Sequence, residues 1–307
     1  MKILITGGTG MVGSAFKNIH TEHSLVLVGS SDYDLCIASD CKRMIDEHQP
    51  DAIIHLAAKV GGVKGNTKYV ADFFRDNIVM NTNVLHAAME FRIPKVLSLL
   101  STCIYPNNPT YPLTEGQIHN GEPHSSNFGY AYAKRMLEVQ SRAIRQQYNL
   151  SYITAVPNNI YGQCDNFDLD NGHVIPAIIR KVHTSISDGK TPRFWGTGSP
   201  LREFTYSKDI AKALLWMVEE YDNPLPLNIG STEEISVYDL VLKIQRLMNA
   251  RTSSTWDDTM PQGQYKKPSS NSRFMSFNPE FKYASLSEGL SETIDWYLKE
   301  YPNVRGV

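Results

Sequence analysis

One pair of residues in the sequence has the types and the spacing of acid–base redox chemistry. Tyr130 and Lys134 stand four residues apart, so on a helix they lie on the same face. A lysine ammonium near a phenol favours the phenolate and lowers the pKa of the tyrosine. Such a tyrosine exchanges a proton with a carbonyl or an alcohol while hydride moves to or from a nicotinamide. The pair therefore predicts a redox site, although the same spacing also occurs on ordinary surface helices.

A serine upstream of this pair extends the pattern. Ser101 follows the apolar stretch Lys95–Leu100, which has the length and composition of a buried strand. In a parallel sheet the carboxyl ends of the strands face the ligand crevice, so Ser101 is expected at that edge. There the hydroxyls of Ser101 and Tyr130 are placed to bind the reacting oxygen of a substrate.

The glycines near the start of the sequence have the spacing of a nucleotide-binding turn. Gly7, Gly10 and Gly13 follow the apolar stretch Lys2–Thr6 and open a helical pattern. Glycine lets backbone N–H groups approach a pyrophosphate, which the positive end of the following helix also favours. An ordinary strand–helix turn is the alternative, but the position after a buried strand favours a dinucleotide. The cofactor contacts expected in this turn are Gly7, Gly10, Met11, Val12 and Gly13.

The end of the second expected strand indicates which dinucleotide binds. An NAD-binding strand usually ends in an acidic residue that holds the ribose 2′-hydroxyl. Here Ser30 and Ser31 follow Leu25–Gly29 and accept a 2′-phosphate without repelling it, so we predict NADP(H); the nearby Asp32 keeps NAD as the alternative. Further expected cofactor contacts are Asp34 and Leu35 at the adenine end, and Leu56, Ala57 and Ala58 after another strand, whose His55 we expect to be a hydrogen-bonded core residue.

These candidate residues require a sheet whose strands all end on one side. Four short apolar strands are expected, at 2–6, 25–29, 52–56 and 95–100. Helical stretches alternate with them, at 11–20, 39–49 and 71–91, which predicts an α/β fold with a doubly wound parallel sheet of the Rossmann type. Later helices are expected at 174–182, 209–220 and 237–248. We expect a dinucleotide-binding domain over 1–157, to which the chain returns around 203–222, and a smaller C-terminal α/β substrate lobe over 158–307.

The composition excludes several classes of protein. The 307 residues carry a net charge of −2, whereas nucleic-acid and anionic-membrane binders normally carry a basic excess. No apolar stretch approaches the ~18 residues of a membrane span, and the first one is too short for a signal peptide. The 4 cysteines are too few and too irregular for a disulfide scaffold or a zinc site. We therefore expect a cytoplasmic protein with no metal and no membrane or nucleic-acid partner.

Three further segments narrow the interpretation. They are Ser-Thr-Cys-Ile-Tyr-Pro at 101–106, Asp-Asn-Phe at 165–167 with Gly-His-Val-Ile-Pro at 172–176, and Trp-Gly-Thr-Gly-Ser-Pro-Leu-Arg-Glu-Phe at 195–204. With the glycine turn and the Tyr–Lys pair, they make the whole chain resemble the extended short-chain dehydrogenase/reductase family, and within it the GDP-L-fucose synthases. The resemblance implies a homodimer that epimerises GDP-4-keto-6-deoxy-D-mannose at C3 and C5 and then reduces C4 with NADPH.

The resemblance also implies roles for individual residues. Ser101, Tyr130 and Lys134 match the reductase triad, while Cys103 and His173 match the base and acid of epimerisation. The C4 ketone acidifies the protons at C3 and C5, and a thiol and an imidazole both titrate within reach of neutral pH. The other implied contacts are Lys134, Pro157, Asn159, Ile160 and His173 for the cofactor, and Lys181, Trp195, Arg202 and Lys267 for the substrate.

Plainer interpretations exist for some of these residues. Cys103 has the character of a small buried apolar side chain, which is the usual environment of a free cysteine. His173 suits a structural hydrogen bond, Arg202 suits a surface ion pair with Glu203, and Lys267 suits a solvated charge or a contact with the pyrophosphate of the substrate. The sequence departs from the family pattern at Asn158, Gln163, Cys164 and Gln262.

Two other functions compete with the epimerase–reductase. The first is another NAD(P)-dependent epimerase or dehydratase acting on nucleotide sugars; Thr102 and Cys103 stand where dehydratases typically carry an acidic pair, which disfavours dehydration. The second is a non-catalytic NADP-binding regulator, which the retained Ser101, Tyr130 and Lys134 disfavour. For the homodimer, the helices around 77–88 and 130–147 are the expected contact.

Overall fold

The alternating strands and helices of the first half of the chain form one parallel sheet. The computed structural model describes residues 1–259 and 265–307. In the described residues every neighbouring pair of this sheet is parallel, and the strand order is β2-β1-β3-β4-β5-β9. The strands are β1 (Lys2–Thr6), β2 (Ser24–Val28), β3 (Ala52–His55), β4 (Lys95–Leu99), β5 (Ser151–Val156) and β9 (Leu227–Asn228).

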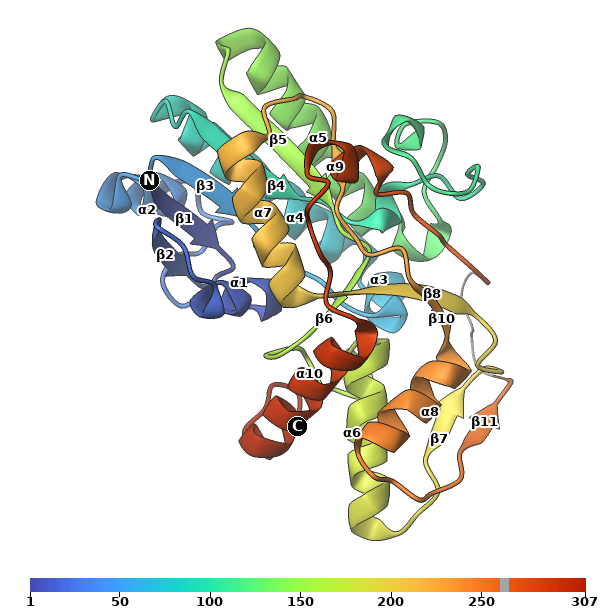
Figure 1. Cartoon of the computed structure of the whole chain (residues 1–307). Helices are drawn as coiled ribbons and strands as arrows, with labels where there is room; N and C mark the ends of the chain where they lie inside the picture. The colour runs from blue at the N-terminus through green and yellow to red at the C-terminus, as the bar shows by residue number, and fades with distance from the viewer. Residues whose placement is uncertain (260–264) are drawn as a thin grey trace.

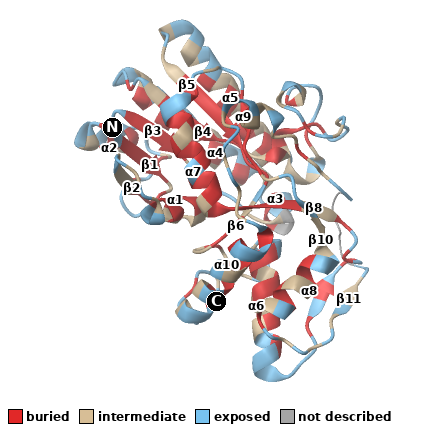
Figure 2. Ribbon diagram, in the orientation of Figure 1, coloured by how far each residue is buried: buried red, intermediate tan, exposed pale blue. Residues whose placement is uncertain are grey.

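Helices cover both faces of the sheet because its strands alternate apolar side chains between the two faces. Ile3 and Ile5 pack toward α1 (Met11–Ala15), α7 (Ser207–Glu220) and α9 (Ser272–Phe277), and Leu4 packs toward the opposite layer. That opposite layer consists of α2 (Ala38–His48), α4 (Val70–Glu90) and α5 (Phe128–Tyr148). Figure 2 shows the sheet as a buried layer between helices whose outer faces are exposed. The predicted doubly wound α/β fold is confirmed.

A smaller lobe lies beside the carboxyl ends of this sheet (Figure 1). Its core joins buried residues such as Phe167, Ile179, Phe204, Leu240 and Tyr297. Its helices are α6 (Val174–Asp188), α8 (Val237–Leu247) and α10 (Leu286–Glu300). Its strands are β6 (Asn159–Tyr161), β8 (Leu201–Tyr206) and β10 (Glu234–Ser236) in one sheet, and β7 (Arg193–Trp195) with β11 (Thr255–Asp257) in another.

The chain passes more than once between the two lobes. β8 pairs with β6 and β10, but α7 directly after it packs on the large sheet, and β9 extends that sheet at its edge. Figure 1 shows α7 lying across the large sheet. Short helical turns connect the main elements: α3 (Val63–Lys68), η1 (Phe16–Asn18), η2 (Thr102–Ile104), η3 (Glu115–Gln117) and η4 (Ser125–Asn127).

The expected elements agree with the observed ones to within a few residues, with two informative differences. The helix expected over 11–20 ends at Ala15 and tightens into η1, and the helix expected over 174–182 continues to Asp188, where Gly189 in a left-handed conformation (φ 70°) ends it.

The strand order reverses between β1 and β3, which is where open α/β sheets bind ligands. Among the described residues, no helix is both long and apolar enough to cross a membrane.

Candidate active site

One cavity of about 1630 Å³ begins at the glycine turn and extends into the smaller lobe. A site for one drug-sized ligand occupies roughly 300–1,000 Å³, so this volume suits a dinucleotide together with a second nucleotide-sized ligand. The sequence-predicted site residues line this cavity with the single exception of Ser31, which is exposed and lies outside the lining. The fold therefore brings residues from across the chain to one place.

The glycine turn has the geometry that close approach to a pyrophosphate requires. Gly7 has a left-handed backbone (φ +68°), and a Cβ on it would lie 2.9 Å from the backbone nitrogen of Ala57. A Cβ on Gly13 would lie 2.3 Å from the carbonyl oxygen of Gly7, which no real Cβ tolerates. Gly10, Met11 and Val12 complete this part of the lining. The cradle fits a dinucleotide, and a side chain on Gly7 or Gly13 would destroy it.

The loop after β2 forms one end of the cavity. Ser30, Asp34 and Leu35 line it. The carboxylate of Asp32 accepts the N–H of Gly29 at 2.7 Å, so this acid closes the turn. Its role in the turn supplies a structural reason for an acidic residue at this point of the sequence.

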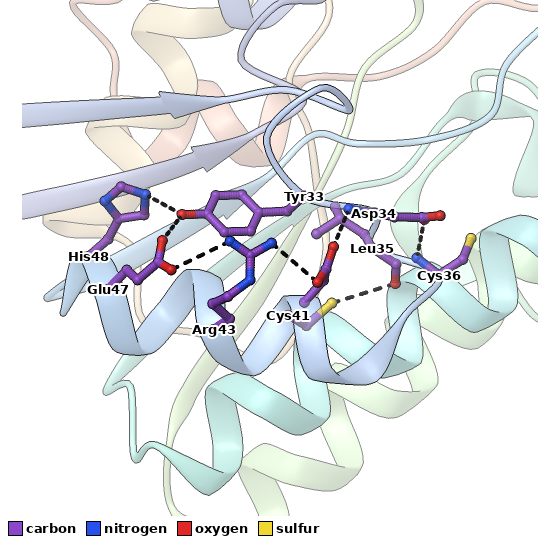
Figure 3. A network of polar contacts seen from close by, with 9 residues as sticks. Tyr33, Asp34, Leu35, Cys36, Cys41, Arg43, Glu47 and His48 are labelled. Carbon is purple, nitrogen blue, oxygen red and sulfur yellow. Dashed lines mark hydrogen bonds and ion pairs between the residues drawn. The ribbon is translucent and has the colours of Figure 1, made fainter.

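A polar network on α2 braces this loop, and the sequence analysis missed it. Tyr33 lines the cavity, and its hydroxyl donates to Glu47 at 2.5 Å and lies 3.1 Å from His48 Nε2. The guanidinium of Arg43 lies 4.6 Å from the centre of the Tyr33 ring. Figure 3 shows these contacts together with the bond from the N–H of Cys36 to Asp34. The network fixes the backbone whose residues line the adenine end of the expected site.

His55 is a core histidine, as predicted. Its Nδ1 lies 2.8 Å from the hydroxyl of Thr6, and its Nε2 lies 3.0 Å from Oδ1 of Asn81. Burial and, secondly, the charge of Lys134 lower the pKa of His55 to about 4. Beyond it Leu56, Ala57 and Ala58 line the cavity with small or apolar surface.

The predicted reductase triad comes from the carboxyl end of β4 and the start of α5. Ser101 follows β4, and its hydroxyl accepts the N–H of Cys103 at 3.4 Å at the start of η2. Tyr130 and Lys134 lie in the first two turns of α5, and the Lys134 ammonium donates to the carbonyl oxygen of Leu99 at 2.7 Å. All three side chains belong to residues that line the cavity.

The expected effect of Lys134 on the pKa of Tyr130 is wrong. Burial raises the pKa of Tyr130 well above its usual range, and the nearby thiol of Cys103 raises it further. Burial also lowers the pKa of Lys134 to about 8. The lysine forms its hydrogen bond with Leu99, and desolvation is the dominant influence on the phenol.

Cys103 and Lys267 share the same desolvated region. Burial raises the pKa of the Cys103 thiol, while the charge of Lys267, a hydrogen bond with Ser101 and the charge of Lys134 act against this rise. Burial lowers the pKa of Lys267 to about 8, and the Cys103 thiolate opposes that fall. Cys103 therefore has both apolar neighbours, since it packs against the core beneath the sheet, and polar groups that act on its thiol.

His173 lines the cavity immediately before α6. Burial lowers the pKa of its imidazole, and the charge of Arg305 contributes. Asp165 lines the same region; it is buried, and its Oδ2 has no hydrogen-bond partner among the described residues. Burial raises the pKa of Asp165 to about 7, although its Oδ1 accepts the N–H of Asn166 at 2.7 Å. Sequence reasoning missed Arg305, whose charge acts on both His173 and Asp165.

The four expected substrate contacts belong to residues 158–307 and line the cavity. Lys181 of α6 donates to the carbonyl oxygen of Arg193 at 2.9 Å, and its ammonium lies 5.7 Å from the Trp195 ring. Arg202 of β8 donates to the carbonyl oxygen of Leu201 at 2.7 Å. With Lys267 these residues supply three cations and an indole to the cavity lining, a set suited to a nucleoside diphosphate.

The proposed surface ion pair between Arg202 and Glu203 is wrong. Glu203 is buried, and its carboxylate accepts the N–H of Ser269 at 3.0 and 3.1 Å and the hydroxyl of Ser269 at 2.5 Å. The amide of Asn158 donates to it at 3.2 Å. Asn158 also accepts the hydroxyl of Thr205 at 2.6 Å, so this departure from the family pattern has a structural role here.

The remaining expected cofactor contacts line the cavity, whereas two of the residues that depart from the family pattern do not. Pro157, Asn159 and Ile160 line the cavity, and the Asn159 amide donates to the carbonyl oxygen of Glu203 at 2.8 Å. Gln163 and Cys164, two further departures from the family pattern, lie outside the lining. Gln262 lies outside the described residues.

Comparisons with known proteins agree with this geometry. Residues 3–230 match the model of the NAD dependent epimerase/dehydratase family. A GDP-L-fucose synthase of Dictyostelium discoideum is 39% identical over 310 residues, covering 99% of this chain and 97% of that protein. A GDP-L-colitose synthase of Yersinia pseudotuberculosis is 34% identical, covering 99% of this chain and 100% of its own.

A solved structure is similar over almost the whole chain. It is a GDP-L-fucose synthetase from Naegleria fowleri bound to NADP, with a TM-score of 0.94 and 37% identity, covering 99% of this chain and 94% of that one. The similarity covers both lobes of the chain. The chain belongs to the NAD dependent epimerase/dehydratase family, and within it to the GDP-L-fucose synthases.

Proposed function

We propose that the protein is a bifunctional enzyme that converts GDP-4-keto-6-deoxy-D-mannose to GDP-L-fucose, by epimerisation at C3 and C5 followed by NADPH-dependent reduction at C4. The observation that carries this proposal is a single cavity that combines a glycine cradle, a Ser–Tyr–Lys group and a separate thiol and imidazole. The first two features suit a reductase, whereas the thiol and imidazole are the additional groups that an epimerase needs.

The oxygen at C4 is the group on which both reactions depend. When it is removed from water between Ser101 and Tyr130, two hydroxyl donors stabilise the negative charge that develops on it. Bound in the glycine cradle, NADPH supplies the hydride that reduces C4. Tyr130 then gives its proton to the C4 oxygen, and the raised pKa of this phenol keeps it protonated and ready to donate.

Epimerisation requires a proton to leave one face of a carbon and another to arrive on the opposite face. Cys103 and His173 belong to different lobes and both line the cavity, so a hexose between them meets a proton acceptor and a proton donor. The thiolate of Cys103 takes the proton at C3 or C5, and the electrons of the C–H bond move toward the C4 oxygen. The imidazolium of His173 returns a proton to the carbon.

The two lobes divide the binding of the ligands in this proposal. Residues 1–157, together with the returning helix α7, hold NADP(H) through the turn at Gly7–Gly13, Ser30, Asp34, Leu35 and the small residues after β3. Residues 158–307 hold the nucleotide sugar, with the cations Lys181 and Arg202 near its diphosphate and Trp195 against a ring.

A homodimer completes the proposal. Phe74 on α4 and Phe128 on α5 are 41% and 52% exposed, and these two helices pack against each other. Apolar side chains exposed on adjacent helices favour pairing with the same helices of a second copy. Light scattering should give twice the mass of the chain, and a monomer mass at micromolar concentration would reject this part of the proposal.

The decisive experiment supplies GDP-4-keto-6-deoxy-D-mannose and NADPH in D₂O. We expect stoichiometric oxidation of NADPH and GDP-L-fucose that carries deuterium at both C3 and C5. Turnover without deuterium at these carbons would reduce the proposal to a C4 reductase, and no consumption of NADPH would reject the reductase. The variant Cys103→Ser should lose deuterium incorporation far more than it loses NADPH binding.

A further inference from the structure

Two consecutive cations of α5 bind the two ends of segment 100–103, which carries the hydroxyl and the thiol of the candidate site. The ammonium of Lys134 donates to the carbonyl oxygen of Leu99 at 2.7 Å, immediately before this segment. Nε of Arg135 donates to the carbonyl oxygen of Ile104 at 2.6 Å, immediately after it. The helix therefore holds this piece of backbone at both ends.

The part of the segment around Ser101 is also held by the sheet. The N–H of Leu100 donates to the carbonyl oxygen of Ala155 at 2.8 Å. The N–H of Thr102 donates to the carbonyl oxygen of Pro157 at 3.2 Å, so the backbone on both sides of the serine continues beside β5. Ser101 therefore has backbone anchors of its own, which do not involve α5.

The position of Cys103 depends on the short turn η2. The N–H of Cys103 donates to the hydroxyl of Ser101 at 3.4 Å, and the N–H of Ile104 donates to the carbonyl oxygen of Ser101 at 3.1 Å. At the end of this turn Arg135 binds the carbonyl oxygen of Ile104, and its Nη1 donates to the carbonyl oxygen of Gly121 at 2.7 Å. One guanidinium therefore fixes the end of η2 to the later part of the same long loop.

The burial of Arg135 is costly. The residue is 4% exposed, and among the described residues it has no ion pair with a carboxylate and its Nη2 has no hydrogen-bond partner. The ring of Tyr132, whose centre lies 5.5 Å from the guanidinium carbon, offers a weaker cation–π contact. A buried cation without a counter-charge costs free energy, which favours a functional role for its hydrogen bonds over a role in stability alone.

We propose that Arg135 is a positioning residue for epimerisation, which fixes Cys103 relative to Tyr130 because the same helix carries the phenol and holds the turn of the thiol. This inference rests on the proposed function for the role of Cys103 as the carbon base. In that step the C–H bond at C3 or C5 breaks, its electrons move toward the C4 oxygen, and an S–H bond forms. Arg135 exchanges no proton; it keeps the thiol in place beside a sugar whose C4 oxygen is held by Tyr130.

The first experiment needs no substrate and measures amide hydrogen exchange by NMR in the parent protein and in Arg135→Met. Exchange of the N–H of Ile104 should become roughly tenfold faster, because a hydrogen bond from a charged donor no longer fixes the turn. The N–H of Leu100, which pairs with β5, should keep its rate. Arg142→Met is the matched control, because Arg142 lies about two turns further along α5 and pairs with Glu138 at 3.3 Å.

The second experiment separates the two reactions of the proposed function. Incorporation of deuterium at C3 and C5 from D₂O should fall about 10²-fold in Arg135→Met, which is the effect of displacing a reacting group by about 1 Å. The reverse of the reduction, in which GDP-L-fucose gives its C4 hydride to NADP⁺, breaks no C–H bond at C3 or C5. Its first turnover and the binding of NADPH should therefore stay close to those of the parent protein.

The outcomes separate the inference from the proposed function. An unchanged exchange rate at Ile104 would overturn the inference, and so would equal acceleration at Leu100 and Ile104, which indicates a general loss of stability. Equal losses of deuterium incorporation and of the reverse reaction would also overturn it. If exchange changes as expected but the parent protein neither oxidises NADPH nor incorporates deuterium with the keto sugar, the proposed function fails while the anchoring of the turn stands.

Arg135→Lys keeps the inference testable if Arg135→Met does not fold. The lysine retains the charge, but it presents one nitrogen where the guanidinium uses two, so it reaches one of the two carbonyl oxygens. We expect a smaller loss of deuterium incorporation than in Arg135→Met, with NADPH binding and the reverse reaction unchanged. Deuterium incorporation equal to that of the parent protein would overturn the inference, and failure of both variants to fold would reduce Arg135 to a residue of core stability.

Discussion

Replacing Asp165 with asparagine should make the protein more stable at neutral and alkaline pH, although the residue lines the active-site cavity. The carboxyl is buried, its Oδ2 has no hydrogen-bond partner among the described residues, and its pKa is raised from 3.8 to about 7. An asparagine keeps an oxygen for the N–H of Asn166, which Asp165 accepts at 2.7 Å. The substitution therefore removes a charge that has poor surroundings and retains the bond that is made.

The size of the effect follows from the two pKa values. Between pH 4 and pH 7 the unfolded chain ionises Asp165 while the folded protein keeps it protonated, so folding becomes less favourable as the pH rises through this range. A difference of about three pKa units corresponds to at most ~4 kcal/mol. Relaxation around the carboxylate and water in the cavity reduce this, and we expect about 2 kcal/mol at pH 8 and almost nothing at pH 4.

Urea unfolding of the parent protein and of Asp165→Asn at pH 4.5, 6 and 8 measures this difference. Asp168→Asn is the matched control, because the pKa of Asp168 is lowered by backbone N–H groups of Asn171 and Asp170, and its loss should destabilise the fold at neutral pH. Parallel stability curves for the parent and Asp165→Asn would refute the reasoning, and so would a larger gain at pH 4.5 than at pH 8.

The other predictions concern the reductase, the cofactor and the core. Tyr130→Phe should slow NADPH oxidation by the keto sugar roughly 10²–10⁴-fold in stopped-flow assays and leave NADPH binding intact; normal turnover would remove the phenol from the reaction. Gly13→Ala should abolish NADPH binding, since its Cβ would lie 2.3 Å from the carbonyl oxygen of Gly7; a fluorescence titration with an unchanged Kd would contradict the cradle. His55, with a pKa of about 4, should cost about 2 kcal/mol of stability between pH 7.5 and pH 5 as the unfolded chain takes up the proton, and His55→Gln should flatten that slope.

Short sequence patterns were sufficient to predict the strands, the glycine turn and the edge of the sheet at which the candidate site lies. The expected strand at 2–6 is β1, and the expected strand at 95–100 is β4 with one extra residue, because a short apolar stretch bounded by turn residues has few other folded forms. The turn at positions 7, 10 and 13 leaves little room for a side chain, so the spacing of these glycines predicts the turn from the sequence alone. Parallel strands then place Ser101 at the ligand edge by topology alone.

The parts of the site that sequence analysis missed depend on contacts between distant segments. Glu203 accepts a hydrogen bond from Ser269, which lies 66 residues later in the chain, and neither residue type predicts this contact. Tyr33 contacts Glu47 and His48 of α2, and the orientation of this helix depends on packing against the sheet. Asp165 belongs to a segment that the sequence analysis singled out, but its burial follows only from the fold. Such pairs carry no periodicity and no spacing rule, so only the folded chain defines them.

The wrong expectation about Tyr130 shows that desolvation is the largest influence on the pKa values of the groups around it. Spacing on a helix shows that a lysine is near a phenol, but it contains no information about desolvation, which here dominates the pKa of Tyr130. Desolvation shifts acids and bases in opposite directions: it raises the pKa values of Tyr130 and Cys103 and lowers those of Lys134 and Lys267 to about 8. Several neighbouring groups act against this effect at the thiol, namely the charges of Lys267 and Lys134 and a hydrogen bond with Ser101.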